Sequence, residues 1–125
     1  MILDTNAVSA LAERDPAVIH IVSSAPSPRL SFISVAEFEF GILGSSRPDP
    51  AKAFIDGLSA VLRVLFPSPE TIGHYAWIAD HLKRTGRPIP HNDMWTAALA
   101  RQFELPILSR DRHFDYVGGI IRIGW

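Results

Sequence analysis

Short apolar stretches alternate with longer segments of helical periodicity along almost the whole chain. The short stretches predict buried strands, which fall at residues 1–3, 30–33, 61–66, 105–109 and 120–123. Between most of them, apolar residues recur every three or four positions, which predicts amphipathic helices. Strands that alternate with single or paired helices pair in parallel through crossover connections. The pattern therefore predicts an α/β fold in three layers, a central parallel β-sheet flanked by helices.

Each predicted helix begins at a residue that can cap its free amide groups or at a proline that fits its first turn. These start signals are Thr5 or Asn6, Asp15-Pro16, Ser34, Asp49-Pro50, Pro69-Glu70, and Asn92 or Asp93. Gly44 and Gly86 are suited to end two of the helices. Ser34 and Glu37 also have the spacing of a capping box, which offers Glu37 a purely structural role.

The composition narrows the class of protein. A chain of 125 residues, 47% of them hydrophobic, fits a single domain over residues 1–125. No apolar run approaches the ~20 residues that span a bilayer, so no membrane association is expected. An acid at position 4 leaves no room for a basic leader and an apolar segment, so no signal peptide is expected. The lack of cysteine excludes disulfides and thiolate metal sites and fits a cytoplasmic location.

Four acidic residues fall at one predicted edge of the sheet. Asp4 ends the first strand, Glu37 lies in the first turn of the helix after the second strand, Asp93 starts the alanine-rich helix, and Asp111 follows the fourth strand. Parallel strands deliver their carboxyl ends, and the starts of the following helices, to the same edge. Each acid alone also fits a helix cap, a first-turn acid or a turn. The four together favour a shared site.

Carboxylates gathered in one pocket raise one another's pKa, and a hard divalent cation relieves the repulsion. Mg²⁺ and Mn²⁺ prefer oxygen ligands, and two such ions about 4 Å apart can activate water and stabilise the leaving oxygen of a phosphodiester. The net charge of −1 excludes a globally cationic nucleic-acid binder. Without these four acids, nine acids face twelve Lys and Arg residues, so the rest of the chain is about +3 and suits RNA.

Motifs for other hydrolytic chemistries are missing from the sequence. There is no HExxH, no GxSxG and no GxxxxGK[ST], so a zinc protease, a serine hydrolase and a P-loop nucleotidase are unsupported. Basic residues that flank the predicted site are candidates for substrate contacts, with ordinary solvated surface as the alternative. They are Arg84, Arg87, Arg110, Arg112, His91 and His113.

The ordered motifs resemble those of the PIN-domain ribonucleases, most closely the VapC toxins of bacterial toxin–antitoxin pairs. The resemblance covers essentially the whole chain. Departures at His91-Asn92, Trp95-Thr96 and Ser109 leave the four acids in place. The matching motifs are Ile2-Leu3-Asp4-Thr5-Asn6, Ser34-Val35-Ala36-Glu37 with Gly41, Asp93 ahead of Thr96-Ala97-Ala98-Leu99-Ala100, and Leu108-Ser109-Arg110-Asp111 with Phe114.

This resemblance implies a PIN-type parallel sheet and endonucleolytic cleavage of RNA that depends on one or two Mg²⁺ or Mn²⁺ ions. It implies a homodimer and a cognate VapB-like antitoxin that inhibits cleavage. The catalytic and metal-binding acids it implies are Asp4, Glu37, Asp93 and Asp111. The polar residues that orient those acids or bound water are Thr5, Asn6 and Ser109.

Two other functions stay open on the sequence. A housekeeping RNA-processing nuclease of the same fold would act without an antitoxin. A non-catalytic RNA- or protein-binding module would keep the acids for folding or for metal-stabilised structure. The segment from Ile72 to Leu82 carries apolar residues on more than one face, which independently predicts a homodimer. Tyr75 and Trp77 are expected to divide between the core and the dimer surface.

Overall fold

The computed structural model describes residues 1–125 and contains one five-stranded sheet in the order β3-β2-β1-β4-β5. All four strand pairings are parallel, as the sequence predicts. The central strand β1 pairs with β2 on one side and β4 on the other. The strands are shorter than predicted: β1 (Ile2–Leu3), β2 (Arg29–Ser31), β3 (Arg63–Leu65), β4 (Ile107–Leu108) and β5 (Arg122–Ile123).

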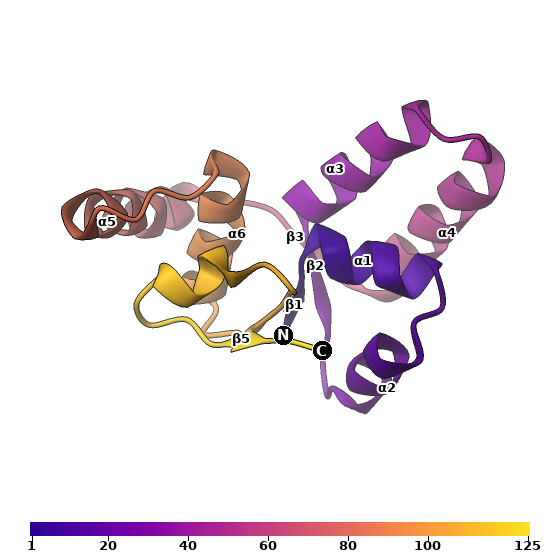
Figure 1. The fold of residues 1–125 in the computed structure, drawn as a ribbon, viewed down its shortest axis with the longest axis horizontal. Helices are drawn as coiled ribbons and strands as arrows, with labels where there is room; N and C mark the ends of the chain where they lie inside the picture. Colours follow the sequence, from indigo (N-terminus) through magenta and orange to yellow (C-terminus); the bar gives the residue numbers. More distant parts are fainter.

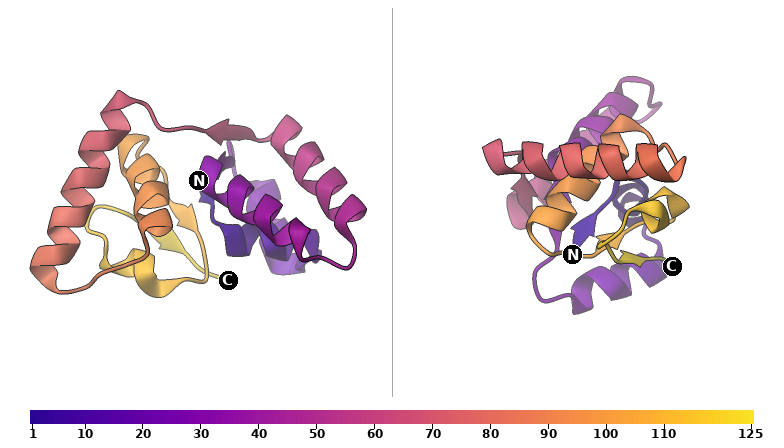
Figure 2. Two further views of the ribbon diagram at one scale, coloured as in Figure 1. Left: turned by 90° about the horizontal axis from the view of Figure 1, so that it is seen from above. Right: turned by 90° about the vertical axis from the view of Figure 1, so that its left-hand side faces the viewer.

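Helices cover both faces of the sheet and give the three predicted layers (Figure 1). Four helices lie on one face: α1 (Thr5–Ala12), α2 (Pro16–Ser24), α3 (Phe32–Leu43) and α4 (Pro48–Val61). The other face carries α5 (Pro69–Thr85), α6 (His91–Gln102) and the 3₁₀ helix η1 (Arg112–Tyr116). Seen from above, β3 runs between the two groups of helices (Figure 2). None of the helices has both the length and the apolar character that crossing a bilayer requires.

Two hydrophobic cores lie on the two faces of the sheet because successive strand residues point in opposite directions. Ile2 and Ile107 belong to a core of thirteen buried residues formed with α5, α6 and η1. Leu3 and Leu108, the next residue in each strand, belong to a core of eight buried residues on the side of α1 to α4. The short central strands are therefore buried on both faces, and the polar residues that follow them are held in fixed positions at the carboxyl edge.

Two predicted helix starts are wrong by a few residues. The apolar run 30–33 predicts one strand, but β2 ends at Ser31 and Phe32 opens α3. Phe32 stacks on Phe66, with ring centroids 6.3 Å apart. An apolar residue at this position fits either the end of a strand or the first turn of a helix, and two residues are too few for periodicity to separate the two. Helix α4 begins at Pro48 rather than at Asp49-Pro50, since a proline at either first-turn position lacks only an amide that the helix does not use.

The start of α6 also differs from the prediction, with a consequence for the site. Pro90 occupies the N-cap position and His91 is the first helical residue. Asn92 and Asp93 therefore lie inside the first turn and do not cap the helix. Their side chains are free to point out of the helix toward neighbouring elements.

Candidate active site

An open pocket of about 490 Å³ lies at the carboxyl edge of the sheet. Its lining includes the four acids that the sequence assigns to this edge, and they come from four separate segments of the chain. Asp4 follows β1, Glu37 lies on α3, Asp93 lies on α6, and Asp111 precedes η1. The parallel topology therefore brings together side chains that are far apart in the sequence.

Asp4 is the most buried of these acids, with 6% of its surface exposed. Its backbone occupies the N-cap position of α1, where Thr5 or Asn6 was predicted, but its carboxylate caps no amide. Instead, Oδ2 accepts hydrogen bonds from Asn6 Nδ2 at 2.7 Å and from Ser109 Oγ at 2.9 Å. Burial raises the pKa of Asp4, and the nearby charges of Glu37 and Asp111 add to that effect. A capping role for the Asp4 carboxylate is therefore excluded.

Asn6 and Ser109 tie the loop after β4 to the start of α1. Asn6 Nδ2 also donates to Ser109 Oγ at 3.0 Å, and Asn6 Oδ1 accepts from the Arg110 amide at 3.0 Å. The same Ser109 hydroxyl accepts from the Asp111 amide at 2.9 Å. The hydroxyl donates one hydrogen bond and accepts two, which is its full capacity. This network fixes Asp4 and Asp111 relative to each other.

Glu37 is the sixth residue of α3, in its second turn, so the prediction that it lies in the first turn is wrong. The capping box at Ser34 is also wrong, because Ser31 caps this helix and accepts from the Ser34 amide at 3.0 Å. The Glu37 carboxylate is held on both oxygens by neutral donors. Oε2 accepts a hydrogen bond from the Thr5 hydroxyl, and Oε1 accepts from Asn92 Nδ2 at 2.7 Å. Helices α1 and α6 thereby position a side chain of α3.

A buried polar cluster behind the pocket holds these helices against the sheet. The Ser34 hydroxyl donates to the carbonyl of Leu3 at 2.8 Å, at the end of β1. Ser31 Oγ lies 2.8 Å from Ser34 Oγ and 3.3 Å from Thr96 Oγ1 on α6. All three hydroxyl residues have 0% exposure. Sequence reasoning assigned none of them this role, because their partners lie on other segments of the chain.

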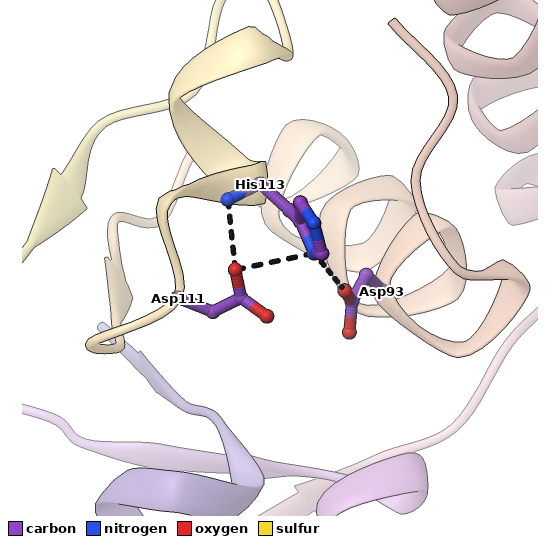
Figure 3. A group of neighbouring side chains, drawn as sticks. All are labelled: Asp93, Asp111 and His113. Carbon is purple, nitrogen blue, oxygen red and sulfur yellow. Dashed lines mark hydrogen bonds and ion pairs between the residues drawn. The ribbon is translucent and has the colours of Figure 1, made fainter.

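Asp93 and Asp111 face each other across the ring of His113 (Figure 3). His113 Nδ1 lies 3.4 Å from Asp93 Oδ2 and 3.2 Å from Asp111 Oδ1. The backbone amide of His113 also donates to Asp111 Oδ1 at 2.9 Å. Burial raises the pKa of Asp93 to about 6, with further contributions from the charges of Asp4 and Asp111, although His113 acts in the opposite direction.

Only one of the predicted basic residues lines the pocket. Arg110 does so while pairing with Asp15 at 3.0 Å, and its guanidinium lies 4.6 Å from the centre of the Trp125 ring. The remaining candidates other than His113 have partners elsewhere or lie on exposed surface. Arg84 pairs with Asp80, Arg87 lies over the Tyr116 ring, His91 bonds to the Tyr75 hydroxyl, and Arg112 is exposed on η1.

Two further polar residues of the pocket lie along α1 and were not predicted. Ser9 and Glu13 line the pocket together with Thr5. These three residues follow one another at intervals of four, so they share one face of the helix. The spacing of these three polar residues indicates one polar face of α1, but nothing in the sequence shows that this face borders the acids.

The donor set of the pocket fits a divalent cation. No Lys or Arg forms an ion pair with Asp4, Glu37, Asp93 or Asp111, and Arg110 pairs with Asp15 instead. The atom His113 Nδ1 is buried, and its contacts with Asp93 and Asp111 do not have hydrogen-bond geometry. One ligand atom each from Asp93, Asp111 and His113 lie within 4.8 Å of one another. Uncompensated carboxylates with spare lone pairs are suited to a hard divalent ion.

Comparisons with known proteins agree with this geometry. The PIN domain family matches residues 1–120 of the chain. Ribonuclease VapC1 of Haemophilus influenzae is 33% identical over 113 residues, which cover 87% of this chain and 84% of that protein. Ribonuclease VapC2 of the same species is 31% identical over 126 aligned residues, covering 98% and 96% of the two chains.

Solved structures give the same assignment. VapBC-1 from nontypeable Haemophilus influenzae superposes with a TM-score of 0.85 at 29% identity, over 99% of this chain and 96% of the other. VapBC2 from Rickettsia felis, bound to a DNA fragment from its promoter, has a TM-score of 0.89 over 99% and 97% of the chains, and at 18% identity it shows a likeness of fold. The chain belongs to the PIN-domain family, in the group of proteins named ribonuclease VapC.

Proposed function

We propose that this protein is an endoribonuclease toxin that depends on Mg²⁺ or Mn²⁺ and is inhibited by a VapB-like antitoxin. The observation that carries the proposal is the pocket with four carboxylates from four segments and no Lys or Arg paired to any of them. The names of the relatives, ribonuclease VapC and VapBC, support the activity and the kind of partner. They also favour a toxin over a housekeeping nuclease.

Asp4, Glu37, Asp93 and Asp111 would hold one or two divalent ions. A divalent ion bound there lowers the pKa of water and stabilises negative charge on a phosphodiester. Hydrogen bonds to Asp4 and Glu37 keep their carboxylates in place before an ion or substrate arrives, so little reorganisation is needed. The donors are Thr5, Asn6, Asn92 and Ser109.

The RNA chain would enter from the open side of the pocket. Arg110 lies at the rim of the pocket, and its side chain is more than half exposed although it pairs with Asp15. A guanidinium in that position can bind a backbone phosphate next to the scissile bond. Ser9 and Glu13 extend the polar lining along α1.

Cleavage of RNA by the purified protein, freed of antitoxin, tests this proposal. We expect fragments with Mg²⁺ or Mn²⁺, no fragments with a chelator, and recovery when the ion is restored. Asp4→Asn should abolish cleavage, whereas Asp49→Asn, on an exposed turn of α4, serves as a matched control. Metal-independent cleavage, or full activity of Asp4→Asn, would contradict the proposal.

The toxin role is tested in growing cells. Expression of the wild-type chain should arrest growth, and co-expression of the antitoxin encoded beside it should restore growth. Continued growth on expression of the active enzyme would favour the housekeeping nuclease. Cleavage at background level, with Mg²⁺ still raising the melting temperature, would favour the non-catalytic binding module.

A homodimer through α5 is part of the same proposal. Ile72 and Trp77 are 61% and 43% exposed on this helix, which leaves apolar surface beyond the needs of one core. Light scattering should give the mass of a dimer at micromolar concentration. A monomeric mass would contradict this part of the proposal.

A further inference from the structure

We infer that His113 is a direct ligand of the divalent ion in this pocket and makes the site prefer a first-row transition-metal ion, such as Mn²⁺, over Mg²⁺. The inference rests on the proposed function in one respect, because it concerns the metal site of the same pocket. It adds a nitrogen ligand to a site otherwise made of carboxylates.

The separations between the three side chains match those of neighbouring ligands around one ion. Ligand atoms about 2.1 Å from an octahedral ion lie about 3 Å apart when adjacent and about 4 Å apart when opposite. His113 Nδ1 lies 3.2 Å from Asp111 Oδ1 and 3.4 Å from Asp93 Oδ2. One ligand atom from each of the three side chains lies within 4.8 Å of the other two. A small shift of the side chains therefore suffices to enclose an ion between them (Figure 3).

The ring nitrogen that faces the acids is left without a hydrogen-bond partner. Nδ1 is buried and lies within ion-pair distance of both carboxylates, but neither contact has the geometry of a hydrogen bond. A buried polar atom without a partner is costly, so its presence calls for an explanation such as an ion. Coordination through Nδ1 would leave the ring proton on Nε2, and 43% of the side chain is exposed to solvent.

The backbone keeps His113 in this position. Asp111 occupies the N-cap of η1 and accepts the His113 amide, so both side chains emerge from one tight turn. The next residue, Phe114, is fully buried and anchors that turn in the core. The backbone of His113 therefore cannot move far from Asp111 without disturbing the packing of η1.

A nitrogen ligand separates the two ions that fit the carboxylates. Mg²⁺ binds oxygen almost exclusively and keeps much of its water shell, whereas transition-metal ions accept imidazole readily. Replacing one oxygen ligand by His113 Nδ1 should therefore favour Mn²⁺ over Mg²⁺. The alternative is that His113 carries a proton and acts as a counter-ion to the two aspartates, in which case a metal ion would displace it.

Electron spin echo spectroscopy of the Mn²⁺-loaded full chain tests the assignment without measuring catalysis. We expect ¹⁴N modulation from a coordinated imidazole in the wild type and its loss in His113→Gln. Mn²⁺ binding, followed by the spectrum of the free ion, should weaken about tenfold in His113→Gln, and Mg²⁺ binding, measured by competition, by less than twofold. His20→Gln, on the exposed side of α2, is the matched control and should match the wild type.

Absence of ¹⁴N modulation in the wild type would overturn the inference, even if His113→Gln failed to fold. Modulation that persists in His113→Gln would also overturn the inference. So would an equal loss of affinity for Mn²⁺ and Mg²⁺ in that variant, or tighter binding of Mn²⁺ by the variant than by the wild type. A protein that binds Mn²⁺ through His113 but cleaves no RNA would refute the proposed function and leave this inference standing. RNA cleavage without ¹⁴N modulation would support the proposed function and refute the inference about His113.

Discussion

Asn92 Nδ2 donates to Glu37 Oε1 at 2.7 Å, a contact between residues 55 positions apart in the sequence. The other oxygen of Glu37 accepts from the Thr5 hydroxyl. Asn92 lies next to Asp93 in the first turn of α6, so one helical turn supplies both an acid of the pocket and a donor that orients a second acid. Neither donor is charged, so the two hydrogen bonds orient the carboxylate without forming an ion pair.

Asn92 is predicted to act as a positioning residue in RNA cleavage. Asn92→Ala frees one oxygen of Glu37 and should lower kcat about tenfold, which corresponds to the loss of about 1.4 kcal/mol. KM should change less than twofold, because Asn92 is not expected to contact RNA. Unfolding free energy should change by less than about 0.5 kcal/mol, since Asn92 is exposed. Steady-state kinetics would refute the role if kcat were unchanged, or if Ser27→Ala, on an exposed loop, gave the same loss.

Asp93 should make the metal-free protein less stable as pH rises. Its pKa is raised from 3.8 to about 6, so the folded chain holds the proton more tightly than the unfolded chain does. The stabilisation is complete below about pH 3.8 and is lost as pH rises through about 6. Metal-free Asp93→Asn should therefore exceed the wild type by about 1–2 kcal/mol at pH 8, and by much less at pH 4.

Chemical denaturation at the two pH values, with a chelator present, measures this difference. Asp49→Asn, which neutralises an exposed acid in the first turn of α4, should show no gain that grows with pH. Saturating Mn²⁺ should reverse the order at pH 8, because the wild type binds the ion more tightly than Asp93→Asn. Equal stability of wild type and Asp93→Asn at both pH values would contradict the environment described for Asp93.

Arg110 is predicted to bind a phosphate of the RNA. Arg110→Ala should raise KM about three- to tenfold with little change in kcat, and should make KM less dependent on salt. Arg63→Ala is the matched control, because Arg63 is exposed at the start of β3, at the opposite edge of the sheet. Equal effects of the two substitutions would mean that general positive charge, and not the rim of the pocket, governs binding.

Two serine substitutions compare a bonded and an unbonded buried hydroxyl. Ser34→Ala removes the donor to the Leu3 carbonyl, so it should cost about 1–3 kcal/mol of unfolding free energy. Ser59 Oγ is also buried but has no partner, so Ser59→Ala should change stability by less than about 0.5 kcal/mol or increase it. Denaturant unfolding of the two variants measures both values. A larger loss for Ser59→Ala would contradict the cluster that holds α3 against β1.

The position of the acids was predictable because it depends on one robust rule. Parallel strands share a carboxyl edge whatever their order, so Asp4 and Asp111 meet without any knowledge of the strand order β3-β2-β1-β4-β5. Glu37 shows where local rules fail. Ser31 and Ser34 both suit an N-cap, and in the structure Ser31 caps the helix while its first residue, Phe32, stacks on Phe66.

The contacts that orient the acids were not predictable from the sequence. Asn92 reaches Glu37 only because Pro90 caps α6, two residues before the earliest predicted cap, and because α3 lies beside it. His113 was one of several basic candidates near the site. Its position between two acids depends on the tight turn of η1, and periodicity carries no information about such turns.

Anomalous diffraction from crystals of the full chain soaked in Mn²⁺ tests the central claim most directly. The account predicts an anomalous peak in the pocket, in contact with the carboxylates of Asp4, Asp93 and Asp111, and no peak in crystals of Asp93→Asn. Mn²⁺ bound elsewhere on the surface, with no peak between these carboxylates in the wild type, would contradict it.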